Sequence, residues 1–269
     1  MKTDIATNVF PLKIYCSIGL LVQKSVRFIV CRFFDEIDEN LPSQKLCFIG
    51  WGAKLSGKIS KRLGDHLNSD TLLLEDGFLQ GVGDTKCKYS LLIDRNAPHY
   101  SAGSQSYFAK MKTYSLNDAE VLRSHNLITL WQQERLSKYN AARDKSEAPR
   151  NRYVLVCDQV YGDAAIDAGL ASPESFTRML NAALAEYSDH TIILKTHPDL
   201  LSRGKKGHFD LATLASNKRI KVLSDPVHAS KLIEYADAIY TVTSQMGFEA
   251  LIWGKRVRCF GMPFYAGWG

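Results

Sequence analysis

The sequence VTSQMGFEAL at residues 242–251 stands between two stretches with the composition of β-strands. The apolar run AIYT precedes it at 238–241, and alternating apolar residues follow at 257–260. This order predicts a strand, a tight turn, a helix and a second strand. Thr243 and Ser244 occupy the position of a helix N-cap, where side-chain hydroxyls and the free N–H groups of the first turn leave the sheet edge together.

A helix start of this kind binds phosphate, although the same pattern also fits an ordinary capped helix. Two other stretches favour a site. The strand-like run TIILKTHP at 191–198 ends in a lysine and a His-Pro pair, and GMPFYAGWG follows at 261–269. Because parallel strands open their carboxyl ends onto one crevice, we expect Lys195, His197 and Ser244 to converge on one anionic group.

The composition is that of a globular protein. The chain has 269 residues, of which 45% are hydrophobic and 23% charged, enough for two domains of moderate size. The net charge of +6 suits anionic small molecules or an anionic membrane surface. Long basic runs and interleaved aromatic and basic residues are absent from the sequence, which argues against nucleic-acid binding.

The cysteines indicate a reduced, cytosolic protein. None of the six belongs to a Cys-x-x-Cys pair, so neither a disulfide framework nor a zinc site is expected. No apolar run reaches the length of a transmembrane helix, and no signal-peptide pattern is present.

The first half of the chain alternates helices and strands irregularly. Apolar positions at helical spacing predict a helix over 12–34, either facing the core or lying as a basic amphipathic helix on a membrane. We expect a hairpin that pairs 88–94 with 98–101. The remaining predicted elements are strands at 45–50 and 71–74 and helices at 54–67 and 118–138.

The second half alternates regularly, with short connections. Strands are predicted at 153–157, 191–194, 220–223 and 238–242, and helices at 173–187 and 227–235. Such alternation implies a doubly wound, mostly parallel sheet. The charged stretch 140–152 is the best linker, so we predict an α/β protein of two Rossmann-like domains, 1–143 and 144–269.

Two acidic stretches follow predicted strands. Glu75 and Asp76 come after the first, where a general acid or base would be presented, although solvated loop carboxylates are equally ordinary there. The loop DQVYGD at 158–163 follows the first strand of the second half. Its aspartates are either functional or simple turn and N-cap residues.

Six motifs in order carry a family resemblance. They are WG at 51–52, EDGFL at 75–79, DQ-x-x-GD at 158–163, KTHP at 195–198, TSQMGFEAL at 243–251 and FGMPFYAGWG at 260–269. The chain resembles the bacterial capsule polysaccharide biosynthesis family. More narrowly, it is similar to the N-terminal module of retaining β-Kdo transferases, which build the oligo-Kdo linker on a phosphatidylglycerol-type lipid.

The resemblance implies a GT-B-like fold, with the acceptor on the first domain and the donor CMP-Kdo on the second. It implies double displacement, with Asp163 as nucleophile, Gln159 beside it, Asp158 as a weaker candidate, and Glu75 or Asp76 as acid/base. The implied substrate-binding residues are Lys195, His197, Pro198, Thr243, Ser244, Gln245 and Glu249, of which Glu249 would bind ribose hydroxyls.

A carboxylate nucleophile suits retention at an anomeric carbon, because two successive inversions restore the configuration. No cofactor or metal is expected. The expected partners are the nucleotide sugar, the lipid-linked acceptor and other capsule-assembly proteins. The expected location is the cytoplasm, peripheral on the inner face of the cytoplasmic membrane.

The chain departs from the family at two places. Gln80 and Gly81 stand where the family usually has Arg-Ser, and the chain ends at Gly269 inside a motif that normally continues. The resemblance therefore also allows a truncated or degenerate module that binds nucleotide or lipid without catalysis. A similar enzyme that uses a uridine sugar is a third reading.

Overall fold

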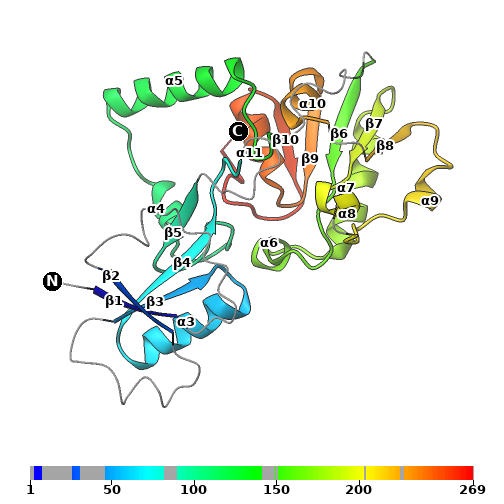
Figure 1. Cartoon of the computed structure of the whole chain (residues 1–269). Coiled ribbons are helices and arrows are strands. Elements are labelled where there is room, and N and C mark those ends of the chain that lie inside the picture. The colour runs from blue at the N-terminus through cyan, green and yellow to red at the C-terminus, as the bar shows by residue number, and fades with distance from the viewer. Residues whose placement is uncertain are drawn as a thin grey trace. The chain divides into compact units, whose positions relative to one another are not determined.

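The computed structural model describes residues 3–7, 26–30, 46–81, 90–140, 149, 151–202, 204–224 and 227–268. The chain divides into two compact units (Figure 1). The first comprises residues 1–80, 85–99 and 103–113, and the second comprises residues 81–84, 100–102 and 114–269.

The first unit contains a five-stranded sheet in the order β2-β1-β3-β4-β5. Its first four strands are parallel, and β5 runs antiparallel to β4. The elements are β1 (Thr3–Thr7), β2 (Val26–Val30), β3 (Leu46–Trp51), α3 (Leu55–His66), β4 (Asp70–Asp76), β5 (Leu91–Asp94) and α4 (Tyr107–Met111).

Helix α3 packs directly on the backbone of β3. A Cβ at Gly57 would lie 1.9 Å from the carbonyl oxygen of Gly52, and one at Gly50 would lie 2.5 Å from the Gly57 Cα. The buried Ser60 hydroxyl donates to the Ile49 carbonyl at 2.9 Å. These glycines are therefore required by close packing rather than by turn geometry.

The second unit contains a parallel five-stranded sheet in the order β10-β9-β6-β7-β8. Its strands are β6 (Tyr153–Cys157), β7 (Thr191–Lys195), β8 (Ile220–Leu223), β9 (Ala238–Thr241) and β10 (Arg256–Cys259). Its helices are α5 (Asp118–Gln133), α6 (Ala164–Ala168), α7 (Pro173–Glu186), α8 (Pro198–Ser202), α9 (Leu211–Leu214), α10 (Ala229–Tyr235) and α11 (Gln245–Ile252).

The strand order places a topological switch point between β6 and β9. From the central β6 the chain moves outward to β7 and β8, then returns to the other side of β6 for β9 and β10. Ligands of open parallel sheets bind outside the carboxyl ends of the strands at such a point. The site is therefore expected where the loops after β6 and β9 meet.

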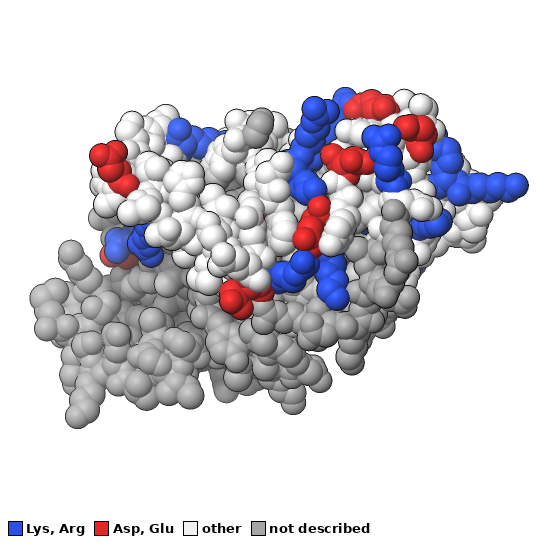
Figure 2. Space-filling model, turned by 90° about the horizontal axis from the view of Figure 1, so that it is seen from above, with Lys and Arg blue, Asp and Glu red and all other residues white. Residues whose placement is uncertain are grey.

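Charge is mixed on the face drawn in Figure 2. Figure 2 shows lysine and arginine side chains beside aspartate and glutamate side chains on the face that it presents. The net charge of +6 is thus not gathered into one basic field on the described part of that face.

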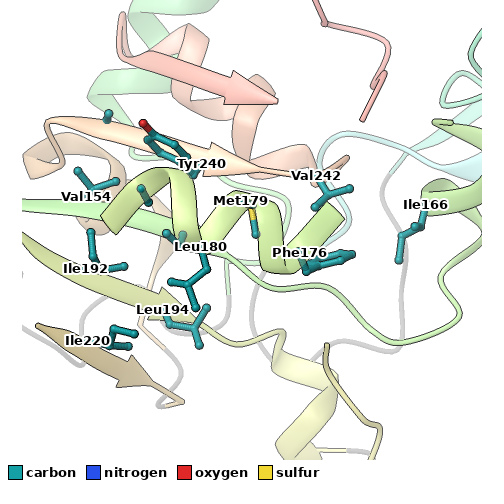
Figure 3. Packing of buried hydrophobic residues seen from close by; sticks show 13 residues of the cluster. Val154, Ile166, Phe176, Met179, Leu180, Ile192, Leu194, Ile220, Tyr240 and Val242 are labelled. Carbon is teal, nitrogen blue, oxygen red and sulfur yellow. The ribbon is translucent and has the colours of Figure 1, made fainter. Parts of the chain in front are cut away.

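The sheet of the second unit is covered on both faces. Val154 and Val156 of β6 pack with Phe176 and Met179 of α7 in one cluster, which is drawn in Figure 3. The alternate β6 residues Tyr153, Leu155 and Cys157 pack with residues of α10 and α11 in a second cluster. All five residues of β6 are buried, as expected for the central strand of a doubly wound sheet.

The predicted α/β class with parallel sheets is confirmed. The strand predicted at 220–223 is β8 residue for residue, and the other strands and helices predicted in the second half differ from the structure by at most two residues at an end. Strands 45–50 and 71–74 and helix 54–67 correspond to β3, β4 and α3. The domain division at 143/144 stays a prediction.

Two predictions were wrong. Residues 26–30 are strand β2 rather than part of a helix, because this β-branched and aromatic run pairs with β1. The predicted 88–94 with 98–101 hairpin does not form, since β5 pairs with β4 and residues 98–101 are not a strand.

The rest of the predicted helix over 12–34, and linker residues 141–148, lie outside the described residues. None of the described helices has both the length and the apolarity needed to cross a membrane.

Candidate active site

The Gln159 side chain joins the loop after β6 to the turn after β9 through hydrogen bonds to Thr243, and we call this pair of contacts the glutamine clasp. The Thr243 N–H donates to Gln159 Oε1 at 2.9 Å, and Gln159 Nε2 donates to Thr243 Oγ1 at 3.0 Å. Both residues are buried. Gln159 thus fixes the loop after β6 against the turn after β9, and the Thr243 hydroxyl is engaged in this clasp.

Asp158 holds a second loop in place. Its carboxylate is 4% exposed and accepts hydrogen bonds from the N–H groups of Gln159 at 2.8 Å and His208 at 3.1 Å. Burial raises the pKa of Asp158 to about 6, and the two N–H groups oppose this rise. The geometry makes Asp158 an anchor for the loop that precedes His208.

Asp163 is the N-cap of α6. Its Oδ1 accepts from the Ala165 N–H at 3.0 Å, and the residue is half-buried. Its negative charge raises the pKa of His197 and of His208, against the larger lowering effect of burial on each. Asp163 and the two histidines therefore share one electrostatic environment.

His197 follows β7 and is held as a defined tautomer. Its Nδ1 accepts from the Asp199 N–H at 3.1 Å, so a neutral ring carries its proton on Nε2. Burial lowers the pKa of His197, which favours the neutral form. The Tyr139 ring meets the His197 ring edge to face, with their centroids 6.1 Å apart.

The start of α11 is built as a capped turn. Ser244 is the N-cap, and its Oγ accepts from the Met246 N–H at 3.3 Å. The buried Tyr265 hydroxyl donates to the Ser244 carbonyl oxygen. A Cβ at Gly247 would lie 2.3 Å from that hydroxyl oxygen, so the glycine makes room for the tyrosine.

Glu249 is a buried carboxylate on the same helix, 1% exposed. Its Oε1 accepts from the Lys138 N–H at 3.0 Å and from Gln245 Nε2 at 3.3 Å. Its buried Oε2 makes no hydrogen bond to any residue that the structure describes. Burial raises the pKa of Glu249 to about 7, while the neighbouring Ser137 side chain and the Lys138 N–H oppose the rise.

The remaining predicted residues of this unit are distributed along the same sheet edge. Lys195, the last residue of β7, is 6% exposed, and its Nζ donates to the Thr196 carbonyl at 3.1 Å. Pro198 is the exposed first residue of α8, and Gln245 opens α11.

The predicted acid/base pair belongs to the first unit. Glu75 and Asp76 are the last two residues of β4 and are half-buried, so they end the strand rather than follow it. Asp76 Oδ2 accepts from Gln80 Nε2 at 3.0 Å. The neutral Gln80 amide thus contacts this acidic pair.

Sequence reasoning missed three residues near the site. His208 stacks on Phe176 with the centroids 3.7 Å apart, and neither of its ring nitrogens makes a hydrogen bond within the described part of the chain. Lys138 and Tyr139 come from the segment after α5. Lys138 was predicted as the last residue of the helix over 118–138, which in the structure ends at Gln133, and Tyr139 lies between that helix and the predicted linker 140–152. Only the glycines around Lys205 offered a signal, since they mark a loop beside a strand end.

Chemically, the second unit offers a carboxylate, a neutral imidazole and a capped helix start at one sheet edge. These groups suit an anionic ligand and a nucleophilic carboxylate. Within the described residues, no group of three or more His, Cys, Asp or Glu residues is arranged to hold a metal ion.

Comparison with known proteins gives a family match. The model of the family described as "Capsule polysaccharide biosynthesis protein" matches residues 85–269. The capsule polysaccharide modification protein LipA of Neisseria meningitidis serogroup A is 33% identical over 236 residues, which is 82% of this chain and 33% of LipA. The lipopolysaccharide-processing protein LpsZ of Rhizobium meliloti is 31% identical over 73% of this chain and 46% of LpsZ. The chain thus spans about a third of LipA.

The chain is also similar to solved structures, among them two of Thermosulfurimonas dismutans KpsC. The Thermosulfurimonas dismutans KpsC structure titled beta Kdo 2,4 transferase has a TM-score of 0.83 and 30% identity, over 99% of this chain and 82% of that one. The KpsC beta Kdo 2,7 transferase structure has a TM-score of 0.68 at 22% identity, over 100% of this chain and 82% of that one, and supports the fold alone.

Proposed function

Because the chain belongs to the capsule polysaccharide biosynthesis family, we propose that it is a glycosyltransferase module that moves Kdo from CMP-Kdo to a lipid-linked acceptor with retention. The observation that carries this proposal is the shared environment of Asp163 and His197 at the switch point of the second unit. The 30% identity to a structure titled as a Kdo transferase supports the choice of sugar.

In the first step, one oxygen of the Asp163 carboxylate attacks the anomeric carbon of Kdo. The bond from that carbon to the phosphate oxygen breaks, and its electron pair leaves with CMP. The start of α11 and the Nε2–H of His197 would stabilise the departing phosphate, because convergent N–H donors favour an anion.

In the second step, an acceptor hydroxyl attacks the same carbon from the face that CMP left. The bond to Asp163 breaks, its electron pair returns to the carboxylate, and the hydroxyl proton passes to a base. Glu75 or Asp76 is proposed as that base. A positioned base contributes roughly a hundred- to ten-thousand-fold to the rate.

The proposed acceptor is a phosphatidylglycerol-type glycolipid, and the proposed location is the inner face of the cytoplasmic membrane. Other capsule-assembly proteins are proposed partners. Because the chain spans about a third of LipA, these statements concern a module and not the whole relative.

A non-catalytic binding module is the second candidate. It is favoured by Gln80, whose neutral amide contacts Asp76 where the family usually has an arginine. Such a module would bind CMP without turnover.

The test follows CMP release from CMP-Kdo in the presence of a Kdo-bearing lipid acceptor analogue. Wild type should release CMP, and Asp163→Asn should lower the rate by a factor of about a thousand or more. Asp167→Asn is the matched control, since Asp167 is an exposed carboxylate on the same short helix.

Equal release by wild type and Asp163→Asn would refute the assignment of the nucleophile. Binding of CMP by wild type without any turnover would favour the binding module. Preferential binding of UDP over CMP would instead indicate a uridine-sugar enzyme.

A further inference from the structure

The proposed donor carries a negative phosphodiester, so its site needs a cation that is open to the ligand. The lysine predicted for this task, Lys195, is 6% exposed, and its Nζ donates to a main-chain carbonyl. Another cation therefore has to be sought among the groups that surround His197 and α11.

A short segment after α5, residues 137–140, lies against that part of the second unit. The Lys138 N–H donates to Glu249 Oε1 at 3.0 Å. The buried Asn140 side chain contacts the buried His228 ring, with Oδ1 3.2 Å from Nε2, and donates to the Ser137 carbonyl at 2.6 Å. The position of this segment is therefore set by buried polar contacts.

Upstream of the segment, α5 is tied to the same helices. Arg135 forms a two-pronged ion pair with Glu234 of α10, at 2.6 and 3.1 Å. Gln132 Nε2 donates to the Ile252 carbonyl at the end of α11, at 2.7 Å. Both ends of the connection are fixed, so the side chains between them have defined places.

The Lys138 side chain lies beside an aromatic ring that contacts His197. Its Nζ lies 5.7 Å from the centroid of the Tyr139 ring, which in turn meets the His197 ring. After burial, the main cause, the positive charge of Lys138 also lowers the pKa of His197. The same charge opposes the burial-driven rise in the pKa of Glu249. The ammonium group thus acts electrostatically on both His197 and Glu249 of α11.

Within the described residues, no carboxylate lies within ion-pair distance of Lys138 Nζ. Lys205, another lysine of this unit, pairs with Asp199 at 3.0 Å.

We propose that Lys138, placed by the segment 137–140, is the cation that binds the anionic phosphate group of the nucleotide donor beside His197 and the start of α11. This inference rests on the proposed function and adds to it a residue outside the motifs that carry the resemblance. The fold holds the segment through the Lys138 main chain, which leaves the side chain for the ligand.

The experiment measures binding of CMP and of cytidine by titration calorimetry to wild type, Lys138→Ala, Lys138→Arg and Lys218→Ala. Lys218 is an exposed lysine that precedes β8, at the side of the sheet where the strands begin and not where the candidate site lies, and it serves as control. Lys138→Ala should weaken the binding of CMP about tenfold and leave the binding of cytidine unchanged, because only CMP carries the phosphate. Lys138→Arg should keep most of the affinity.

A ligand-free measurement tests the same placement. In an NMR titration, the pKa of His197 should be higher in Lys138→Ala than in wild type, because the neighbouring positive charge is gone. Lys218→Ala should leave it unchanged.

The outcomes separate the two proposals. If wild type binds no CMP, the proposed function fails and this inference fails with it. If wild type binds CMP and Lys138→Ala binds it equally well, or loses cytidine and CMP in the same proportion, the role of Lys138 is refuted while the proposed function stands. An unchanged His197 pKa in Lys138→Ala would also refute it.

Discussion

Replacing Gly207 by alanine should disturb the site from a distance. A Cβ at Gly207 would lie 2.1 Å from Asp158 Oδ2 and 2.9 Å from Leu200 Cδ2. The Asp158 carboxylate cannot simply rotate away, because it is buried and accepts hydrogen bonds from Gln159 and His208. The substitution therefore forces the carboxylate, or the whole loop, to move.

The cost has two parts. Losing the His208 hydrogen bond to a charged, buried acceptor costs roughly 1.5–3 kcal/mol, and overpacking costs roughly 1–3 kcal/mol. Because the backbone can relax partly, we expect Gly207→Ala to lower the free energy of unfolding by about 2–4 kcal/mol. For a domain of this size, that corresponds to a fall in Tm of roughly 5–15 °C.

Gly204→Ala is the control in the same loop. Gly204 has φ +61° and nothing within 4 Å of a built Cβ, so alanine there meets backbone strain of about 1 kcal/mol but no clash. Thermal and urea unfolding of both variants should show Gly207→Ala as the more damaging. A Gly207→Ala variant as stable as wild type would show that Asp158 and Leu200 leave room for a Cβ, since without the clash alanine should be neutral or stabilising.

Three further substitutions test neighbouring contacts. Burial raises the pKa of Glu249 to about 7, so the stability it contributes at low pH is lost as the pH rises from about 4.5 to 7. In urea unfolding, the free energy of unfolding of Glu249→Gln relative to wild type should therefore rise by about 3 kcal/mol between pH 4.5 and 8. A difference that stays constant over this pH range would contradict this. Gln159→Leu leaves the buried Thr243 N–H unpaired and should lower the free energy of unfolding, measured in urea, by about 2–4 kcal/mol. A change under about 0.5 kcal/mol would show that the loops after β6 and β9 are joined in another way. Tyr265→Phe removes the hydroxyl that donates to Ser244 and should cost about 1–2 kcal/mol in thermal unfolding, with wild-type stability as the contrary result.

The sheet of the second unit could be predicted because its signals are local. Most of its strands are short apolar runs between turn residues, and several of its helices begin with a recognisable cap, such as Ser244 for α11. Short connections then leave few possible topologies. The strand at 220–223 was predicted to the residue for this reason.

Strand β2 could not be predicted in the same way. Its residues fall within a run with apolar positions at helical spacing, and that spacing predicts a helix over 12–34. What decides the structure is pairing with β1, from Thr3 opposite Val26 to Thr7 opposite Val30. Long-range pairing leaves no periodic signal in the sequence.

The candidate site was predicted in part. The strand ends that carry Asp163, His197 and Ser244 follow from the parallel sheet. The loop-anchoring roles of Asp158 and Gln159 could not be predicted from the sheet, because their hydrogen bonds join residues 50 and 84 positions apart in the chain. Lys138 was missed because it lies outside the alternating pattern, in a segment whose place is set by buried side chains.

In the proposed mechanism, Asp163 becomes covalently bonded to the transferred sugar. The most direct measurement is mass spectrometry of the protein after brief exposure to CMP-Kdo without acceptor, followed by trypsin. The peptide from Tyr153 to Arg178 contains Asp158, Asp163 and Asp167, so fragmentation can locate the adduct. Double displacement through Asp163 should place one Kdo on Asp163 in wild type and none in Asp163→Asn. An adduct on another residue, or release of CMP with no adduct at any time, would contradict it.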